Sequence, residues 1–415
     1  MAMRVDESQI KQLSLEETKN NYLVKNFFPQ YYEEIKVYEM GNRDLQEENH
    51  INFPRNSWNK IVLPFSKNEK MRNKISRFYT EKIRIGVLME MLDYQAVISS
   101  YEHVYRKRDL ATIVTASVDD INFYKKLQTD RDLIIISYPN YVGKTSLEIC
   151  IDMLQPDDNG KEELRATASF LMVARQKKDH SKGYKVPQMS FQGEHDIERC
   201  KMRFAVGNKK NQKRKEKFTN SLEIKPPNSE EINYVHSFYL NKKSQDEKYS
   251  QNIKNISETS LKKNLLMHMQ DRNLHGKIFG GFLMREAFEI GWLCAYQHTQ
   301  GKYPEIYHID DFQFISAVTV GDVIEFEARV TYVYNNLMHV YIEVKKRDFK
   351  GKFTTTNDLH LTFVIADQNN PDQINQQLNE KQLLEEATPI PQVIPVTYEE
   401  AMIQCDARRR IKDFI

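Results

Sequence analysis

The sequence predicts an α+β fold made of two copies of one unit, because one order of elements occurs twice along its 415 residues. A helix over about 86–105 precedes four segments rich in β-branched and aromatic residues, and the same order returns after a helix over about 281–298. The helices align at a constant offset of 195 residues, and the aligned pairs are Gly86/Gly281, Leu88/Leu283, Met89/Met284, Tyr101/Tyr296 and His103/His298. Each copy spans ~110–120 residues, which is the size of one ordinary domain.

The segments that follow each helix read as strands of an antiparallel meander. The predicted strands are Ala111–Phe123, Leu133–Tyr141, Lys144–Met153 and Leu164–Ala174 in the first copy, and His308–Phe314, Val323–Val333, Leu337–Lys346 and Thr355–Ala366 in the second. Apolar residues recur at helical spacing in both helices, and the small residues Ala96, Gly291 and Ala295 would let each helix lie close to a curved sheet. We therefore expect a tandem hotdog fold, in which each long helix is wrapped by an antiparallel sheet.

This fold divides the chain into five segments. They are an N-terminal extension at 1–60 with a short helix near Phe28–Val37, a first hotdog domain at 61–185, a linker at 186–260, a second hotdog domain at 261–370 and a C-terminal tail at 371–415. The linker contains the basic run Lys209–Lys217, and the charge-rich tail ends in Ala407-Arg408-Arg409-Arg410.

Composition excludes several classes of protein. The formal net charge is only +2, and the basic run lacks interleaved aromatic residues, so we expect a solvated linker and no nucleic-acid partner. No apolar run approaches the ~20 residues that a transmembrane helix needs. The four cysteines lack metal-binding or disulfide spacing, which favours a reducing compartment and no metal site. Acidic residues among the first 20 argue against a secretory signal and an uncleaved mitochondrial presequence.

The most specific motif runs from Gln270 to Arg285, with an Asn-x-His-Gly-x-x-x-Gly-Gly core that starts at Asn273. It resembles the second hotdog repeat of eukaryotic acyl-CoA thioesterases, of the acyl-CoA thioesterase 9 type. The segment Arg84–Ala96 is similar to the first helix of that family. Weaker matches, in the order of the family, are Phe191-Gln192-Gly193-Glu194, Pro226-Pro227 with Glu230, Glu231 and His236, and Thr397–Met402, so that the resemblance covers roughly residues 60–410.

The resemblance implies that the chain hydrolyses fatty acyl-CoA to free fatty acid and CoA. It implies a mitochondrial location, with the cytoplasm as the alternative. CoA would be part of the substrate and no cofactor would be needed. Because a hotdog sheet has edges that need pairing, we also expect a homo-oligomer formed through those edges, with a larger assembly as a further possibility.

In the family, a loop Asn and a helix Asp from opposite repeats meet in one site, which gives catalytic roles to Asn273 and Asp93. Asp93 lies among apolar residues two turns into the first helix, where it would act as general base on water, unless it is a solvated helix-face Asp. Asn273 would position the water or the thioester, unless it only caps the helix. The position equivalent to Asp93 in the second helix is Phe288, so we predict one active site per chain.

The start of the second helix is the predicted oxyanion site. Gly280 and Gly281 lack side chains, so their backbone can approach a substrate carbonyl, and the N–H of Gly281 or its neighbour would be the donor. The alternative is that these glycines only serve a turn with positive φ. Substrate-binding candidates are His275, Gly276, Gly280 and Arg285. His275 either contacts substrate or stabilises its loop, and Arg285 either faces the CoA phosphates or forms a surface ion pair.

Two other functions remain open from the sequence. A hydratase acting on 2-enoyl thioesters would need an Asp and a His on one loop-and-helix unit, and the loop here has Asn273 instead. A non-catalytic hotdog subunit, or a CoA-sensing component of a larger assembly, would use the extension, linker and tail as binding surfaces. The retention of both Asp93 and Asn273 favours the enzyme. Glu286 and Glu289 lie near the Phe288 position, but neither is in register with Asp93.

Overall fold

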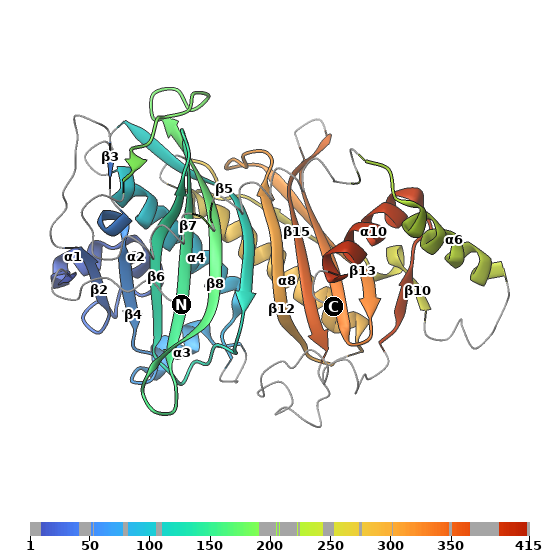
Figure 1. Cartoon of the computed structure of the whole chain (residues 1–415), viewed down its shortest axis with the longest axis horizontal. Helices are drawn as coiled ribbons and strands as arrows, with labels where there is room; N and C mark the ends of the chain where they lie inside the picture. Colours follow the sequence, from blue (N-terminus) through green and yellow to red (C-terminus); the bar gives the residue numbers. More distant parts are fainter. Residues whose placement is uncertain are drawn as a thin grey trace. The chain divides into compact units, whose positions relative to one another are not determined.

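The computed structural model describes residues 10–40, 51–52, 54–77, 82–104, 110–190, 205, 207, 222, 225–243, 253–273, 276–300, 302–347, 351–365 and 390–412. The chain forms two compact units, which Figure 1 draws with their elements labelled. Unit 1 comprises Met1–Asn211, Asn273–His275 and Phe279–Arg285, and unit 2 comprises Gln212–Arg272, Gly276–Ile278 and Glu286–Ile415. The beginning of the second long helix therefore belongs to unit 1.

The elements before residue 211 build most of unit 1. They are β1 (Ile10–Gln12), α1 (Leu15–Asn20), α2 (Tyr22–Phe27), β2 (Lys36–Met40), β3 (Ile51–Asn52), η2 (Pro54–Ser57), β4 (Asn59–Leu63), α3 (Glu69–Ile75), α4 (Ile85–Val104), β5 (Ala111–Phe123), β6 (Leu133–Val142), β7 (Ser146–Pro156), β8 (Glu162–Gln176) and β9 (Gln188–Met189).

The elements after residue 211 belong to unit 2, apart from the first turns of α8. They are α6 (Ser229–Lys243), β10 (Ile253–Asn255), η4 (Ile256–Thr259), β11 (Leu261–Leu266), η5 (Met269–Asp271), α8 (Gly280–His298), β12 (Pro304–Phe314), β13 (Val323–Tyr334), β14 (Leu337–Arg347), β15 (Phe353–Ile365), β16 (Gln392–Ile394) and α10 (Tyr398–Lys412).

The two units have the same strand order. Unit 1 has the order β4-β6-β7-β8-β5 and unit 2 has β11-β13-β14-β15-β12, with antiparallel pairing between neighbours. All eight predicted strands and both predicted long helices are present, with ends within a few residues of those predicted. The tandem hotdog fold is thus confirmed.

The predicted meander is wrong in one respect. β5 pairs with β8 at the far side of the sheet and not with β6, its neighbour in the chain, and β12 pairs with β15 in the same way. Only β6–β8 and β13–β15 are meanders.

The helix α4 is buried on nearly all sides, as a helix wrapped by a sheet must be. Two of its buried polar side chains donate hydrogen bonds to neighbouring segments. Gln95 donates to Asn59 Oδ1 and Ser137 Oγ, both at 2.9 Å, and Ser99 donates to the carbonyl of Ser57 at 2.7 Å. These bonds offset the cost of removing polar groups from water.

The aligned histidines at the ends of the two long helices have matching structural roles. His103 Nε2 lies 2.8 Å from the carbonyl oxygen of Pro187, and His298 Nε2 lies 2.7 Å from that of Pro391. Each histidine is buried and ties the end of its helix to the segment that follows its sheet. Both histidines therefore have structural roles.

Gly291 shows why small residues face the sheet in unit 2. A Cβ at this position would lie 2.7 Å from Leu361 Cδ1 and 2.9 Å from Ile342 Cδ1, closer than side chains tolerate. Ala295 of the same helix and Ala96 of α4 are fully buried. The predicted close approach of helix to sheet is confirmed at Gly291.

The segments predicted as extension, linker and tail contain ordered elements. The helix expected near Phe28–Val37 is wrong, because Asn21 caps α2 through the N–H groups of Leu23 and Val24 and that helix ends at Phe27. The chain then forms β2, which pairs with β4 in the main sheet of unit 1. The linker provides α6 and the tail provides α10. The basic run 209–217 and the patch 191–194 lie outside the described residues.

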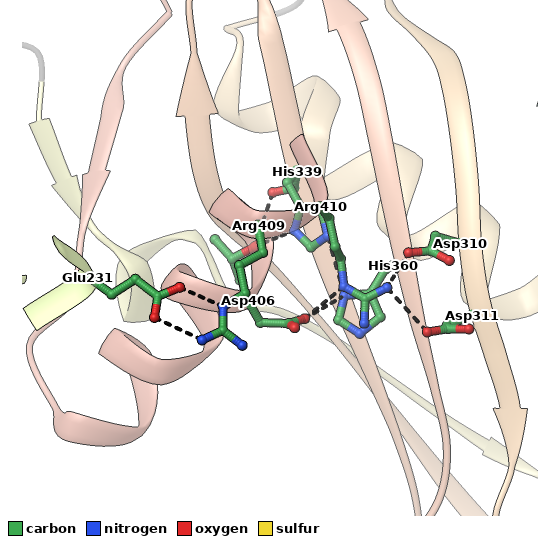
Figure 2. A network of polar contacts seen from close by, with 9 residues as sticks. Glu231, Asp310, Asp311, His339, His360, Asp406, Arg409 and Arg410 are labelled. Atoms are coloured by element: carbon green, nitrogen blue, oxygen red, sulfur yellow. Dashed lines mark hydrogen bonds and ion pairs between the residues drawn. The ribbon is translucent and has the colours of Figure 1, made fainter. Parts of the chain in front are cut away.

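The C-terminal helix α10 is attached to unit 2 by a poorly exposed charge network, which Figure 2 shows. The guanidinium of Arg410 pairs with Asp310, with Asp311 at 3.4 Å and with Asp406 at 2.7 Å. On the outer side of the helix, Arg409 pairs with Glu231 of α6. The arginine run at the end of the tail therefore has a structural role, because its ion pairs attach α10 to the rest of unit 2.

The carboxylates of the network keep Arg410 in its charged form. Burial alone would lower the pKa of Arg410, but the carboxylates of Asp310, Asp406 and Asp311 outweigh burial and hold the pKa above its ordinary value. Burial, aided by the positive charge of Arg410, lowers the pKa of His339 to about 3, so this histidine is neutral at physiological pH. Removal of Arg410 would leave three carboxylates without their common partner.

We expect Arg410→Met to destabilise unit 2 by ~3–5 kcal/mol, because it removes the positive charge that three poorly exposed carboxylates share. The melting temperature measured by scanning calorimetry should fall by on the order of 10 °C. The matched control is Lys412→Ala in the same helix, whose pair with Glu230 is half or more exposed on both sides and should leave the melting temperature nearly unchanged. Equal melting temperatures for both variants would contradict this account.

Candidate active site

The Asp93 side chain has no solvent exposure, although it is charged in its ordinary state. It lies in the middle of α4, whose neighbouring residues Met91 and Leu92 are also buried. Thr115 of β5 donates its hydroxyl to Asp93 Oδ1 at 2.6 Å. Within the described residues Oδ2 has no hydrogen-bond partner that meets ordinary geometric criteria. Asp93 is therefore not a solvated helix-face residue.

The environment of Asp93 raises its pKa from 3.8 to about 7. Burial is the main cause, since it penalises the charged form. The hydroxyl of Thr115 and the backbone N–H of Gly281 oppose this effect, and the nearby carboxylate of Glu90 adds to it. A carboxyl group with a pKa near 7 can exchange a proton with water at neutral pH, as a general base must.

The first turn of α8 approaches α4 closely at Gly281. A Cβ on this residue would lie 2.6 Å from Phe279 Cε1, 2.9 Å from Glu90 Cα and 3.1 Å from Glu90 Cγ. Positive φ is not the reason for this glycine, because neither Gly280 nor Gly281 has a positive φ. In this motif Gly276 has one, at 73°. Close approach of backbone to backbone requires a glycine here, and it brings the Gly281 N–H toward the Asp93 carboxylate.

Aromatic and charged side chains surround this approach. The ring of Phe279 packs on Tyr94, with centroids 4.0 Å apart and an interplanar angle of 32°. Arg285 Nη1 lies 2.5 Å from Glu90 Oε2, and its guanidinium lies over the Phe282 ring at 5.1 Å. Arg285 is thus engaged in a poorly exposed ion pair, and CoA phosphate binding by this residue stays a prediction.

The remaining predicted residues are placed less fully. Asn273 is half-buried and groups with unit 1, as does Gly281, so both belong to the same compact body as Asp93. Gly276 is exposed. His275 lies outside the described residues. The roles predicted for Asn273 in positioning water, and for the Gly280–Gly281 start in polarising a carbonyl, stay predictions.

The position equivalent to Asp93 in α8 has no acidic group. Phe288 is 5% exposed and packs against Phe363, with ring centroids 6.3 Å apart. Glu286, one of the two nearby carboxylates, pairs with Lys263 of β11. The chain therefore has one buried carboxylate at these two equivalent helix positions.

Two residues of the site were missed by sequence reasoning. Thr115 gave no signal, because its contact with Asp93 depends on the pairing of β5 with β8 and on how the sheet wraps α4. Glu90 had a signal, since it lies 195 residues before Arg285, which is the offset of the repeat. Neither residue belongs to a motif that would reveal it alone.

Comparison with known proteins agrees with the presence of two hotdog repeats. The sequence model of the thioesterase superfamily matches the chain twice, at residues 85–161 and 275–350. The mitochondrial acyl-coenzyme A thioesterase 9 of Mus musculus is 28% identical over 372 residues, which cover 86% of this chain and 78% of the mouse protein. The Homo sapiens protein of the same name is also 28% identical, over 369 residues that cover 86% of this chain and 77% of the human protein.

Solved structures include similar chains. An acyl-CoA hydrolase from Staphylococcus aureus is 25% identical and covers 40% of this chain and 91% of its own, with a TM-score of 0.34. A putative oleoyl thioesterase from Lactobacillus plantarum is 8% identical and covers 75% of this chain and 96% of its own, with a TM-score of 0.43. Across the described part of the chain, no helix has the length and apolar character needed to cross a membrane.

The strand order shared by the two units, the two matches to one family model and the relatives that align over 86% of the chain lead to the same assignment. The chain is a tandem hotdog protein that matches the thioesterase superfamily model twice and is similar over 86% of its length to the acyl-coenzyme A thioesterases 9 of mouse and human.

Proposed function

We propose that the chain hydrolyses fatty acyl-CoA to free fatty acid and CoA, with Asp93 as the general base. The observation that carries this proposal is a fully buried carboxyl group with a pKa of about 7, next to the glycine start of a helix. The names of the full-length relatives support the substrate class, since they are acyl-coenzyme A thioesterases.

In the proposed reaction, ionised Asp93 takes a proton from water as the water oxygen attacks the thioester carbonyl. The carbonyl oxygen becomes an oxyanion, which backbone N–H groups in the first turn of α8 stabilise, because they have no partners within the helix. The C–S bond then breaks, and the CoA thiolate takes up the proton that Asp93 holds. Asn273 orients the water or the thioester, and the reaction requires neither a metal nor a covalent intermediate.

The first turn of α8 has a double role in this scheme, and the Gly281 N–H supplies one part of it. Without substrate it supports the Asp93 carboxylate, as the lowering effect on the pKa of Asp93 indicates. With substrate bound, the neighbouring N–H groups of the same turn serve the oxyanion while Gly281 keeps Asp93 oriented. The helix dipole favours both negative charges at this end of α8.

Location and assembly follow the relatives in this proposal. The mouse and human relatives are named as mitochondrial, which supports a mitochondrial location for this chain. Unpaired edges of hotdog sheets support a homo-oligomer. The alternative, a non-catalytic subunit, would explain the fold but not a carboxyl group kept buried at a functional pKa.

Asp93→Asn should lower kcat for acyl-CoA hydrolysis by ~10²–10⁴-fold, because it removes the general base while keeping the shape of the side chain. The measurement is thiol release from a panel of acyl-CoAs, from short to long chains. Asp120→Asn is the matched control, since this residue lies on β5 and is only half-buried. If the folded wild type releases no thiol from any acyl-CoA, the hydrolase proposal is refuted and the non-catalytic subunit is favoured.

The rate should depend on pH in a defined direction. Because Asp93 acts in its ionised form, kcat/KM should rise with pH through a midpoint near 7. Thr115→Val removes a hydrogen bond that lowers this pKa, so the midpoint should move to higher pH while the plateau at high pH changes less. A midpoint that is the same in both proteins would exclude Asp93 as the titrating base.

Gly281→Ala should reduce kcat/KM by ~10²-fold, because a methyl group here meets the backbone of Glu90 and displaces the helix start from Asp93. Gly291→Ala is the control. Its methyl group also meets close neighbours, Leu361 and Ile342, but these are side-chain ends in unit 2. Activities are compared below the melting temperatures of both variants, and equal losses would show that the position of Gly281 has no special importance.

A further inference from the structure

The ion pair of Glu90 and Arg285 has a feature that the Lys263–Glu286 pair, which also involves α8, lacks. Its two members are equivalent positions of the two repeats, because 285 − 90 = 195, which is the offset that also aligns Gly86 with Gly281. Both side chains are poorly exposed, at 11% for Glu90 and 25% for Arg285.

Contact between equivalent positions has a simple consequence. In a symmetric pair of identical repeats, the residue at such a position meets a copy of itself and has the same charge. In this chain the residue is Glu in the first repeat and Arg in the second. Only the combination of a first repeat with a second repeat brings opposite charges together. Two first repeats would oppose Glu to Glu, and two second repeats would oppose Arg to Arg.

We propose that the Glu90–Arg285 pair specifies that the first repeat pairs with the second, and that the same pair positions the Gly281 N–H against Asp93. The second half of this statement rests on the proposed function. The geometry links both halves, because Gly281 would touch Glu90 Cα and Cγ if it had a Cβ. The ion pair thus fixes the residue against which the helix start packs.

The low exposure of the pair makes it selective. Like charges placed together with little access to water repel each other with little screening, whereas exposed pairs contribute almost nothing. The Lys263–Glu286 pair connects β11 and α8 within the second repeat, so it does not depend on which repeats combine. It is a matched control that involves the residue next to Arg285.

The pair also affects the electrostatics of the site. Glu90 precedes Asp93 by one helical turn, and its negative charge raises the pKa of Asp93 after the larger effect of burial. Arg285 faces Glu90, and both charges act on the phenol of Tyr94, whose ring packs on Phe279. Thr115 and the Gly281 N–H, which face Asp93 from β5 and α8, do not titrate. Exchange of the two charges should therefore lower the pKa of Asp93.

The test is a double-mutant cycle of Glu90→Arg, Arg285→Glu and the two together. Each single variant places like charges in contact and should lower the melting temperature by ~5 °C, whereas the double variant should recover most of this loss. Light scattering without substrate should show a change of oligomeric state or soluble aggregates in the single variants and wild-type assembly in the double variant. The Lys263→Glu and Glu286→Lys cycle should leave the oligomeric state unchanged.

A second measurement separates positioning from stability. The single variants should lose at least ~10-fold in kcat/KM. The double variant should regain much of that activity, with its pH midpoint moved below that of the wild type, which a purely structural pair would not cause. If the losses in melting temperature of the two single variants add up in the double variant and assembly is unchanged, the pairing role is refuted. If the pH midpoint of the double variant equals that of the wild type, the positioning role is refuted.

Neutral variants keep the test decisive if Glu90→Arg does not fold. Glu90→Gln and Arg285→Gln remove one charge each without repulsion, and a coupling between them in melting temperature is expected, whereas its absence would refute the proposal. The melting and light-scattering arms need no substrate. A coupled pair in a protein without hydrolysis would thus refute only the proposed function, and an uncoupled pair in an active enzyme would refute only this inference.

Discussion

The structure of the site depends on one unfavourable interaction, which is the burial of the Asp93 carboxyl group inside α4. A rise of its pKa from 3.8 to about 7 corresponds to ~4 kcal/mol when the group is ionised. Between about pH 4 and pH 7 the folded chain holds a proton that the unfolded chain releases, so this residue lowers the free energy of unfolding as pH rises. The hydroxyl of Thr115 and the N–H of Gly281 reduce this cost. Strand β5 and the start of α8 therefore both supply donors to the Asp93 carboxylate.

Much of the fold could be predicted because the periodicity of the sequence repeats. The helices α4 and α8 and all eight strands follow from local patterns of apolar and β-branched residues. The pairing of β5 with β8 could not be predicted, since strand order depends on contacts between distant segments and no residue encodes it locally. Short elements such as β2 were also missed, because five residues of mixed polarity become a strand only beside β4.

The candidate site was predicted in part for the same reason. Asp93 stands out because a carboxylate among apolar helix residues needs a purpose, and Gly281 stands out because glycine is sparse in this chain. The physical reason for Gly281 is the contact with Glu90, which a sequence cannot show before two helices are placed together. Thr115 needed the same knowledge of the sheet. Arg285 was recognised as a charge near the site, but its partner was found only through the fold.

Duplication gives this chain a freedom that a symmetric pair of identical repeats lacks. Each cost at a shared position would otherwise occur twice, including the burial of an acidic side chain. In the second helix Phe288 replaces the carboxylate and buries an aromatic ring against Phe363, which contributes about 1.5–3 kcal/mol instead of a penalty. The same freedom allows Glu90 and Arg285 to carry opposite charges. One repeat can then keep the destabilising carboxyl group that the proposed reaction uses, while the other supplies the helix start that packs against it.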